Sequence, residues 1–379
     1  MTTAGGIPVA SRSAELLRHA SRIELLLDLV FVFVVRQVTE VVAAEPSIIG
    51  VTRAAAILAV VWWMYDAFVW LGNQMTADRL ASRVGFIAAM IAFLLIADAI
   101  PGAFGDSGLL FGFGLLAVVV IHFSMFVVFG GEGSTGSILR VLPTNVGGAV
   151  LVIAAGFFTG PVDWILFGGA ILVFISTSLT DGPRRFDLGG AHFVDRHGLL
   201  MIIAFGETII AVGAASDHRA FDFSLIVGTV LSVGIVAGMW WCYFPGGDSH
   251  ADDPFASLLR RRRASLALTA FGLDHFLMIL GVVLFSAGVR LLIDDVFVAA
   301  DPVAAWLLAF GVGLFLSANA RYRQELGFGA ARERYVGAIA ALPLGGLGLV
   351  APIALEMVAL LSLLALVVLA DRQRRPESR

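Results

Sequence analysis

The sequence predicts an all-α fold, a polytopic membrane helix bundle of about twelve transmembrane helices arranged as two parallel six-helix repeats. Three observations support this prediction: the composition, the long apolar runs and the placement of arginine. Of the 379 residues, 59% are hydrophobic and 14% are charged, whereas soluble domains carry about 25% charged residues. A globule in water cannot bury so much apolar surface, so we expect the lipid bilayer to surround the chain.

The apolar runs define the expected helices. A transmembrane helix needs about 20 mostly apolar residues. Such runs, separated by polar residues or by Gly and Pro, lie at 24–44, 50–72, 83–101, 108–130, 138–159, 163–180, 197–215, 222–244, 264–290, 302–319, 335–350 and 352–370. The last two could form one long helix, but Pro343, Pro352 and the glycines within 345–348 favour a break.

The placement of arginine provides an independent test of this helix count. With the N-terminus in the cytoplasm and one crossing per helix, most arginines fall in cytoplasmic segments, including the run 260–263. The outer segments keep only Arg53, Arg219 and Arg290. This bias follows the positive-inside rule. We therefore expect a multi-pass protein of the cell (inner) membrane with both termini in the cytoplasm.

Two features recur at nearly the same spacing. The Trp-Trp-x-Tyr sequence of residues 62–65 returns 178 residues later at 240–243. Asp28 and Glu207 are 179 residues apart. Six helices per unit is an even number, so both units would insert in the same orientation as a parallel repeat. The alternative is chance, because Trp and Tyr gather at membrane interfaces anyway.

The expected organisation is a cytoplasmic segment at 1–22, six-helix units at 23–181 and 197–371, a cytoplasmic linker at 182–196 and a cytoplasmic tail at 372–379.

Two carboxylates inside apolar runs are the leading candidates for function. Asp28 lies in the first run, and Glu207, preceded by Gly206, lies in the seventh. An acid at membrane depth costs a few kcal/mol and commonly marks an ion or proton pathway. Gly206 would let a helix or an ion approach the backbone. The alternative role for both acids is a structural hydrogen bond between helices.

Other polar residues also fall within or beside the apolar runs. Glu24 shares a helix face with Asp28, and Arg36 can pair with Glu40 four residues on. Asp274 and His275 are adjacent in the ninth run, where they could relay protons or bind a cation. Glu24 could equally be an interfacial residue. Asp274 and His275 could equally be a structural pair whose hydrogen bonds join helices. Asp66 and Asn73, at the inner end of the second run, are expected near the surface.

Signatures of enzymes and metal sites are weak. His192 and His197 are five residues apart, not at the spacing of a helical zinc site. The single cysteine, Cys242, excludes an internal disulfide and a cysteine-rich metal centre. No phosphate-binding loop or nucleophile-elbow motif is present. We expect no catalytic residues, no metal, no cofactor and no nucleic-acid partner.

Two segments resemble a known family. Residues 24–33, Glu-Leu-Leu-Leu-Asp-Leu-Val-Phe-Val-Phe, resemble the ELFFDLVFVF signature of the bacterial low temperature requirement protein A (LtrA) family, with Leu26-Leu27 in place of paired Phe. Residues 192–209 resemble that family's HFxERxGLxxIIxLGExI segment, with Asp195 in place of Glu. The resemblance marks Asn73, His192, Asp195 and Arg196 as motif residues. It implies a polytopic bacterial inner-membrane protein named for growth at low temperature.

The leading functional hypothesis is a cation- or proton-linked channel or transporter in which Asp28 and Glu207 bind or gate the ion. The alternative is a non-transporting membrane scaffold or stress-adaptation protein, in which the acids are sealed among packed helices. A lipid-modifying enzyme is disfavoured because no catalytic constellation is visible. The expected partners are the lipid bilayer, a small cation or proton and, as one alternative, further copies of the chain.

Overall fold

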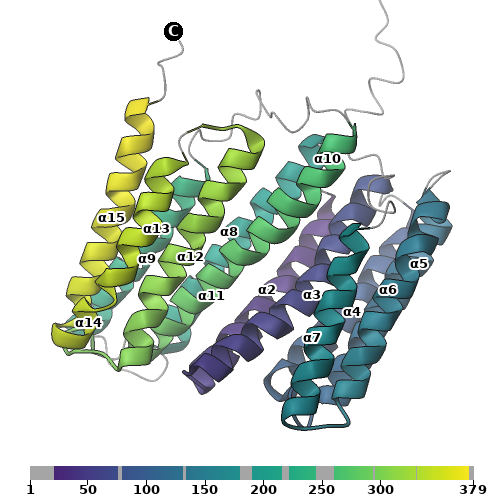
Figure 1. Ribbon diagram of the computed structural model, residues 1–379, viewed down its shortest axis with the longest axis horizontal. Coiled ribbons are helices and arrows are strands. Elements are labelled where there is room, and N and C mark those ends of the chain that lie inside the picture. The colour runs from purple at the N-terminus through teal and green to yellow at the C-terminus, as the bar shows by residue number, and fades with distance from the viewer. Residues whose placement is uncertain are drawn as a thin grey trace, which may run out of the picture.

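A computed structural model describes residues 21–75, 79–130, 134–179, 190–215, 222–244, 260–292, 295–329 and 331–374. Within these ranges the chain is helical, with no β-strand (Figure 1). The expected cytoplasmic segment up to residue 20, the first part of the linker up to residue 189 and the tail from residue 375 lie outside the described residues.

The first half of the chain contains six long helices. They are α2 (Arg22–Ala44), α3 (Ile48–Gln74), α4 (Leu80–Ala99), α5 (Gly108–Phe129), α6 (Ser134–Ala155) and α7 (Pro161–Ser176), with short 3₁₀ turns η1 (Ile100–Gly102) and η2 (Thr177–Leu179). Local sequence sets their starts: the Glu24 side chain accepts the Ser21 N–H at 2.7 Å, and Ser47 Oγ accepts the Gly50 N–H at 3.1 Å. Such caps satisfy amide groups that a helix start leaves unpaired.

The second half is also helical, and several of its helices are short or interrupted. It comprises α8 (Gly190–Ala215), α9 (Phe223–Tyr243), α10 (Arg260–Leu266), a π-helical turn η5 (Ala267–Leu273), α11 (Asp274–Leu292), α12 (Pro302–Leu326), α13 (Arg332–Leu344), α14 (Leu347–Val350) and α15 (Ile353–Arg374). Asp222 and Asp301 cap α9 and α12. Gly327, with φ of 77°, ends α12 in the left-handed region that glycine tolerates.

Each predicted apolar run overlaps helical residues, but two runs are divided: 264–290 covers α10, η5 and α11, and 335–350 covers α13 and α14. The predicted break before Pro352 separates α14 from α15. Among the described residues, ten helices are long and apolar enough to cross a membrane. Charged residues exclude α2 from that set, and α13 has only 13 residues. The count of twelve crossings therefore remains a prediction. The linker differs from expectation, because α8 begins at Gly190 rather than at 197.

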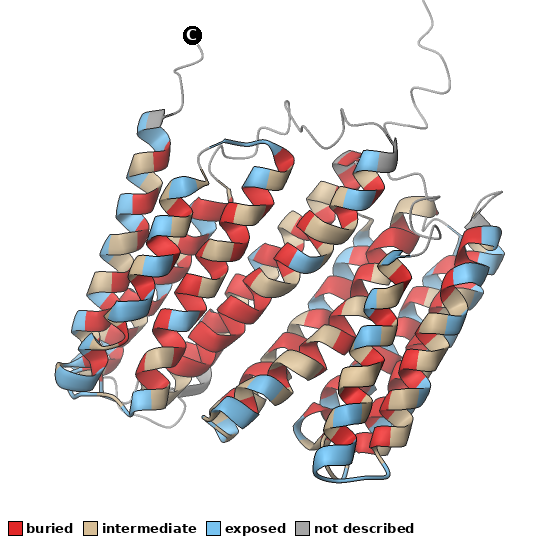
Figure 2. Cartoon of the chain, in the orientation of Figure 1, coloured by how far each residue is buried: buried red, intermediate tan, exposed pale blue. Residues whose placement is uncertain are grey.

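The two halves lie side by side, with α2–α7 in one group and α8–α15 in the other (Figure 1). They meet where α2 and α3 pack against α8 and α11, which we call the inter-half interface. Figure 2 shows buried residues along the faces where helices meet and exposed residues on the outward faces. Large apolar side chains such as Leu172, Val230 and Leu366 are exposed there. Outward apolar surface of this kind suits contact with lipid.

The backbones of α11 and α12 approach each other closely at Gly311. A methyl group on Gly311 would lie 2.6 Å from the Phe285 backbone nitrogen and 2.7 Å from the Gly281 carbonyl oxygen. Small residues at such contacts let membrane helices pack closely. Glycine is therefore required at residue 311 by packing rather than by backbone conformation.

We predict that Gly311→Ala lowers the melting temperature of the purified protein in detergent, because the new methyl forces α11 and α12 apart at a cost of about 1–3 kcal/mol. Gly168→Ala in α7 is the matched control, since a methyl there meets no atom within 4 Å. Thermal unfolding followed by tryptophan fluorescence measures both. Equal melting temperatures for the two variants would contradict this packing.

Candidate functional site

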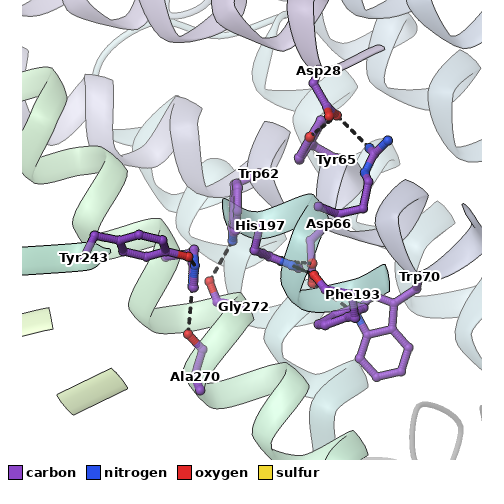
Figure 3. A network of polar contacts seen from close by, with 12 residues as sticks. Asp28, Trp62, Tyr65, Asp66, Trp70, Phe193, His197, Tyr243, Ala270 and Gly272 are labelled. Carbon is purple, nitrogen blue, oxygen red and sulfur yellow. Dashed lines mark hydrogen bonds and ion pairs between the residues drawn. The ribbon is translucent and has the colours of Figure 1, made fainter. Parts of the chain in front are cut away.

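The inter-half interface holds a group of buried polar side chains, here called the inner cluster, whose members are Glu24, Asp28, Tyr65, Asn73, His192 and Arg196. Asp28 Oδ1 accepts hydrogen bonds from Arg196 Nη2 at 2.6 Å and from Tyr65 Oη at 2.5 Å (Figure 3). His192 Nε2 lies 3.4 Å from Glu24 Oε2, and its Nδ1 lies 3.4 Å from Asn73 Nδ2. Asp28 and Arg196 are 0% and 1% exposed, so this ion pair is sealed from solvent.

The inner cluster fixes the register of α2 against α8. Glu24 pairs with His192, and Asp28 pairs with Arg196, each across 168 residues of sequence. Equal offsets mean that the two helices run in the same direction. The first two turns of α8 are therefore inside the bundle, because their polar side chains find partners on α2. This explains why the helix begins earlier than its apolar run.

A second polar pair lies beside the inner cluster. His197 Nε2 is 3.2 Å from Asp66 Oδ1, and its Nδ1 is 2.9 Å from the Phe193 carbonyl oxygen (Figure 3). Trp70 Nε1 donates to Asp66 Oδ2 at 3.2 Å. His197 is 0% exposed and Asp66 is 8% exposed. The pair joins α3 of the first half to α8 of the second.

The π-helical turn η5 contributes the remaining contacts of this region. Its Gly272 carbonyl accepts from Trp62 Nε1 at 2.8 Å, and its Ala270 carbonyl accepts from His275 Nδ1 at 2.9 Å (Figure 3). His275 Nε2 then accepts the Tyr243 hydroxyl at 2.7 Å. Both ring nitrogens of His275 are satisfied with the ring neutral. These hydrogen bonds match the arrangement expected of a structural histidine, and the proton or substrate role of His275 stays a prediction.

Asp274 points to different partners from its neighbour His275. Its Oδ1 accepts from Arg321 Nε at 2.5 Å, and Arg321 also lies 3.8 Å from Glu325. Asp274 is fully buried, whereas the Arg321 side chain is 37% exposed. The structure therefore does not bring Asp274 and His275 together as one relay.

Glu207 belongs to a separate outer cluster. The polar groups that act on its carboxylate include Thr39, Arg36 and Glu40 of α2 and Arg290 of α11. Glu40 pairs with Arg290 rather than with Arg36. Thr39 is eleven residues beyond Asp28 on α2, which places the two clusters roughly 16 Å apart along the helix. Asp28 and Glu207 therefore do not face each other in one site.

The remaining predicted residues are Gly206, Asn73 and Asp195. A methyl group at Gly206 would meet no atom within 4 Å, so the expected close approach of another helix to its backbone is not seen. Asn73 and Asp195 are half-buried, Asn73 at the end of α3 and Asp195 on α8. Of the predicted site residues, the structure thus gathers Glu24, Asp28, Asn73, His192 and Arg196 in the inner cluster.

Asp66 and His197 were not predicted as site residues. Asp66 was expected near the surface because it stands close to the inner end of its apolar run, but Trp70 and His197 cover it. One signal could have indicated it. Asp66 directly follows the Trp-Trp-x-Tyr sequence that suggested the repeat.

A cavity of about 60 Å³ reaches Asp66. Residues of α3, α5, α6, η2 and η5 line it: Trp63, Asp66, Ala67, Trp70, His122, Phe126, Ile138, Val141, Asn145, Thr177 and Leu268. A water molecule needs roughly 10–15 Å³ of such space. The cavity therefore accommodates a solute of a few non-hydrogen atoms beside the Asp66–His197 pair.

The ten long apolar helices among the described residues indicate a multi-pass membrane protein. Residues 19–370 match the family described as bacterial low temperature requirement A protein (LtrA), and the chain belongs to that family. It is also 27% identical over 288 residues to an uncharacterized protein of Rhizobium meliloti (strain 1021), covering 71% of this chain and 68% of that protein. No solved structure matches the chain.

We predict that Arg196→Met destabilises the protein by roughly 3–5 kcal/mol, because it leaves Asp28 buried without its cation. Arg53→Met is the control, since its partner Glu45 is partly exposed and such pairs contribute about 1 kcal/mol or less. Adding Asp28→Asn to Arg196→Met should recover part of the loss. Thermal unfolding in detergent measures all three. A loss for Arg196→Met no larger than that for Arg53→Met would contradict the assignment.

Proposed function

We propose that the chain is a proton-linked cation transporter in which the Asp66–His197 pair exchanges its proton for a cation. The observation that carries this proposal is the position of the pair, which joins the two halves and borders a cavity at Asp66. Transporters built from two units commonly place their site where the units meet.

Hydrogen counting shows what the pair can exchange. The Phe193 carbonyl can only accept, so Nδ1 of His197 carries a hydrogen. Nε2 also faces an acceptor, Asp66 Oδ1, so the contact requires one further proton, on the ring or on the carboxyl group. Loss of that proton leaves a nitrogen lone pair against a carboxylate. A cation beside Asp66 would then compensate the exposed negative charge.

The surrounding charges favour a cation over an anion. Among the described residues of this region, three buried acids, Glu24, Asp28 and Asp66, are paired with one arginine, Arg196, and two histidines, His192 and His197. Charge in a medium of low polarity is costly unless it is paired. A histidine is positively charged only when both ring nitrogens carry a proton, so loss of a proton leaves a negative charge that another cation can balance.

Two repeated units that move against each other would open the site to either side of the membrane in turn. Helices in corresponding order pack in corresponding pairs: α2 with α4 and α8 with α11, α4 with α5 and α11 with α12, α3 with α7 and α9 with α15. This pattern supports two parallel six-helix units at 23–181 and 197–371. Movement of one unit against the other would break or remake the Asp66–His197 contact.

We place this transporter in the bacterial inner membrane with both termini in the cytoplasm, as the positive-inside rule favours. In this transporter the Asp28–Arg196 pair would be a structural ion pair that holds the two units together, and it would not bind the transported ion. That sealed pair is also the observation that favours the second candidate, a non-transporting scaffold or stress-adaptation protein. The two candidates differ in whether Asp66 supports flux.

We predict that proteoliposomes containing the protein move protons when a K⁺, Na⁺ or methylammonium gradient is imposed, as reported by an internal pH dye. Asp66→Asn should slow this movement by about tenfold or more, because an amide cannot exchange a proton for a cation. Asp106→Asn, in the exposed turn before α5, is the matched control and should retain the wild-type rate.

Unfolding temperature and gel-filtration profile establish that each variant is folded before its flux is compared. No cation-driven proton movement with any of the three gradients would refute transport and favour the scaffold. Equal rates for Asp66→Asn and Asp106→Asn would refute the role of Asp66.

A further inference from the structure

The described residues that line the cavity beside Asp66 include several aromatic rings and one carboxylate. Trp63 and Trp70 come from α3, Phe126 from α5 and Asp66 from α3. The indole N–H groups already have acceptors, Asn145 Oδ1 at 3.0 Å for Trp63 and Asp66 Oδ2 at 3.2 Å for Trp70. What these rings offer a ligand is therefore their π surface.

The lining distinguishes between classes of ligand. Among the described residues that line the cavity there is no arginine, and the acid among them, Asp66, would repel an anion. A hard metal ion such as Ca²⁺ prefers six to eight oxygen ligands, and the side chains of Asp66, Asn145 and Thr177 offer few. A carboxylate with aromatic faces is instead the recognised environment of an organic ammonium ion. Asp66 retains acceptor capacity, because a carboxylate accepts about four hydrogen bonds.

The second half shows a comparable arrangement with a cation already in place. Arg334 of α13 is fully buried and donates to Asp371 of α15 at 3.2 and 3.3 Å. It also donates to Asn319 of α12 at 2.8 Å and to the Cys242 carbonyl of α9 at 3.2 Å. In the proposed repeat, these four helices correspond to α3, α5, α6 and α7. The second half thus holds a guanidinium, itself an organic cation, between helices whose proposed counterparts include α3, α5 and α6, which line the cavity.

We propose that the cavity binds a small protonated amine of a few non-hydrogen atoms, with Asp66 as its counter-ion and Trp63, Trp70 and Phe126 around it. This inference rests on the proposed function and names the class of cation that the transporter would carry. The volume of about 60 Å³ suits methylammonium and excludes large polyamines.

Equilibrium binding of radiolabelled methylammonium to the full-length protein in nanodiscs tests the proposal. We expect saturable binding that excess unlabelled methylammonium displaces and that acetate does not. Asp66→Asn should abolish it, and Phe126→Leu should weaken it roughly tenfold through loss of a cation–π face. Asp106→Asn and Phe113→Leu are matched controls, because both residues are exposed and lie away from the cavity lining.

Absence of saturable binding by the folded wild type, or binding by Asp66→Asn equal to wild type, overturns the amine site. The flux assay separates this failure from failure of the transporter. Asp66-dependent proton movement driven by K⁺ or Na⁺, without methylammonium binding, retains transport and rejects the amine. Methylammonium binding lost in Asp66→Asn, without flux under any gradient, retains the amine site and rejects transport.

Discussion

The contact between Asp28 and Arg196 is the constraint on which the arrangement of the two halves depends. Neither side chain can be buried alone, because an unpaired charge in so apolar a setting costs several kcal/mol. Each residue therefore requires the other, and the requirement brings α8 against α2 although they are 168 residues apart. The same offset joins Glu24 to His192, so two contacts fix both the direction and the register of the helix pair.

Once α8 is fixed, the residue after Arg196, His197, lies against Asp66. This second contact differs from the first in its chemistry. Arg196 keeps its charge under all ordinary conditions, whereas a histidine is charged only when both ring nitrogens carry a proton. In the proposed exchange, the permanent ion pair holds the halves together while the adjacent pair releases a proton. Asp66 of the Asp66–His197 pair lines the cavity.

The helices were largely predictable, because each long apolar run carries its own signal and needs no information about distant residues. Asp28 was predictable as an important acid for the same reason. Its partner was not, since Arg196 preceded the apolar run and was assigned to a linker. The sequence also suggested Asp28 and Glu207 as acids of one ion site, but a linear sequence does not show which side chains each acid meets. Contacts of Glu207 with Thr39 and of Asp28 with Arg196 place the two acids in different clusters.

In the proposed exchange, a cation at Asp66 replaces the proton between Asp66 and His197. Proton release during methylammonium binding, measured with a pH indicator in weakly buffered solution, is the decisive experiment. We expect release of about one proton per methylammonium bound by the wild type and none by Asp66→Asn. Binding without proton release, or equal release by the two proteins, would contradict the exchange.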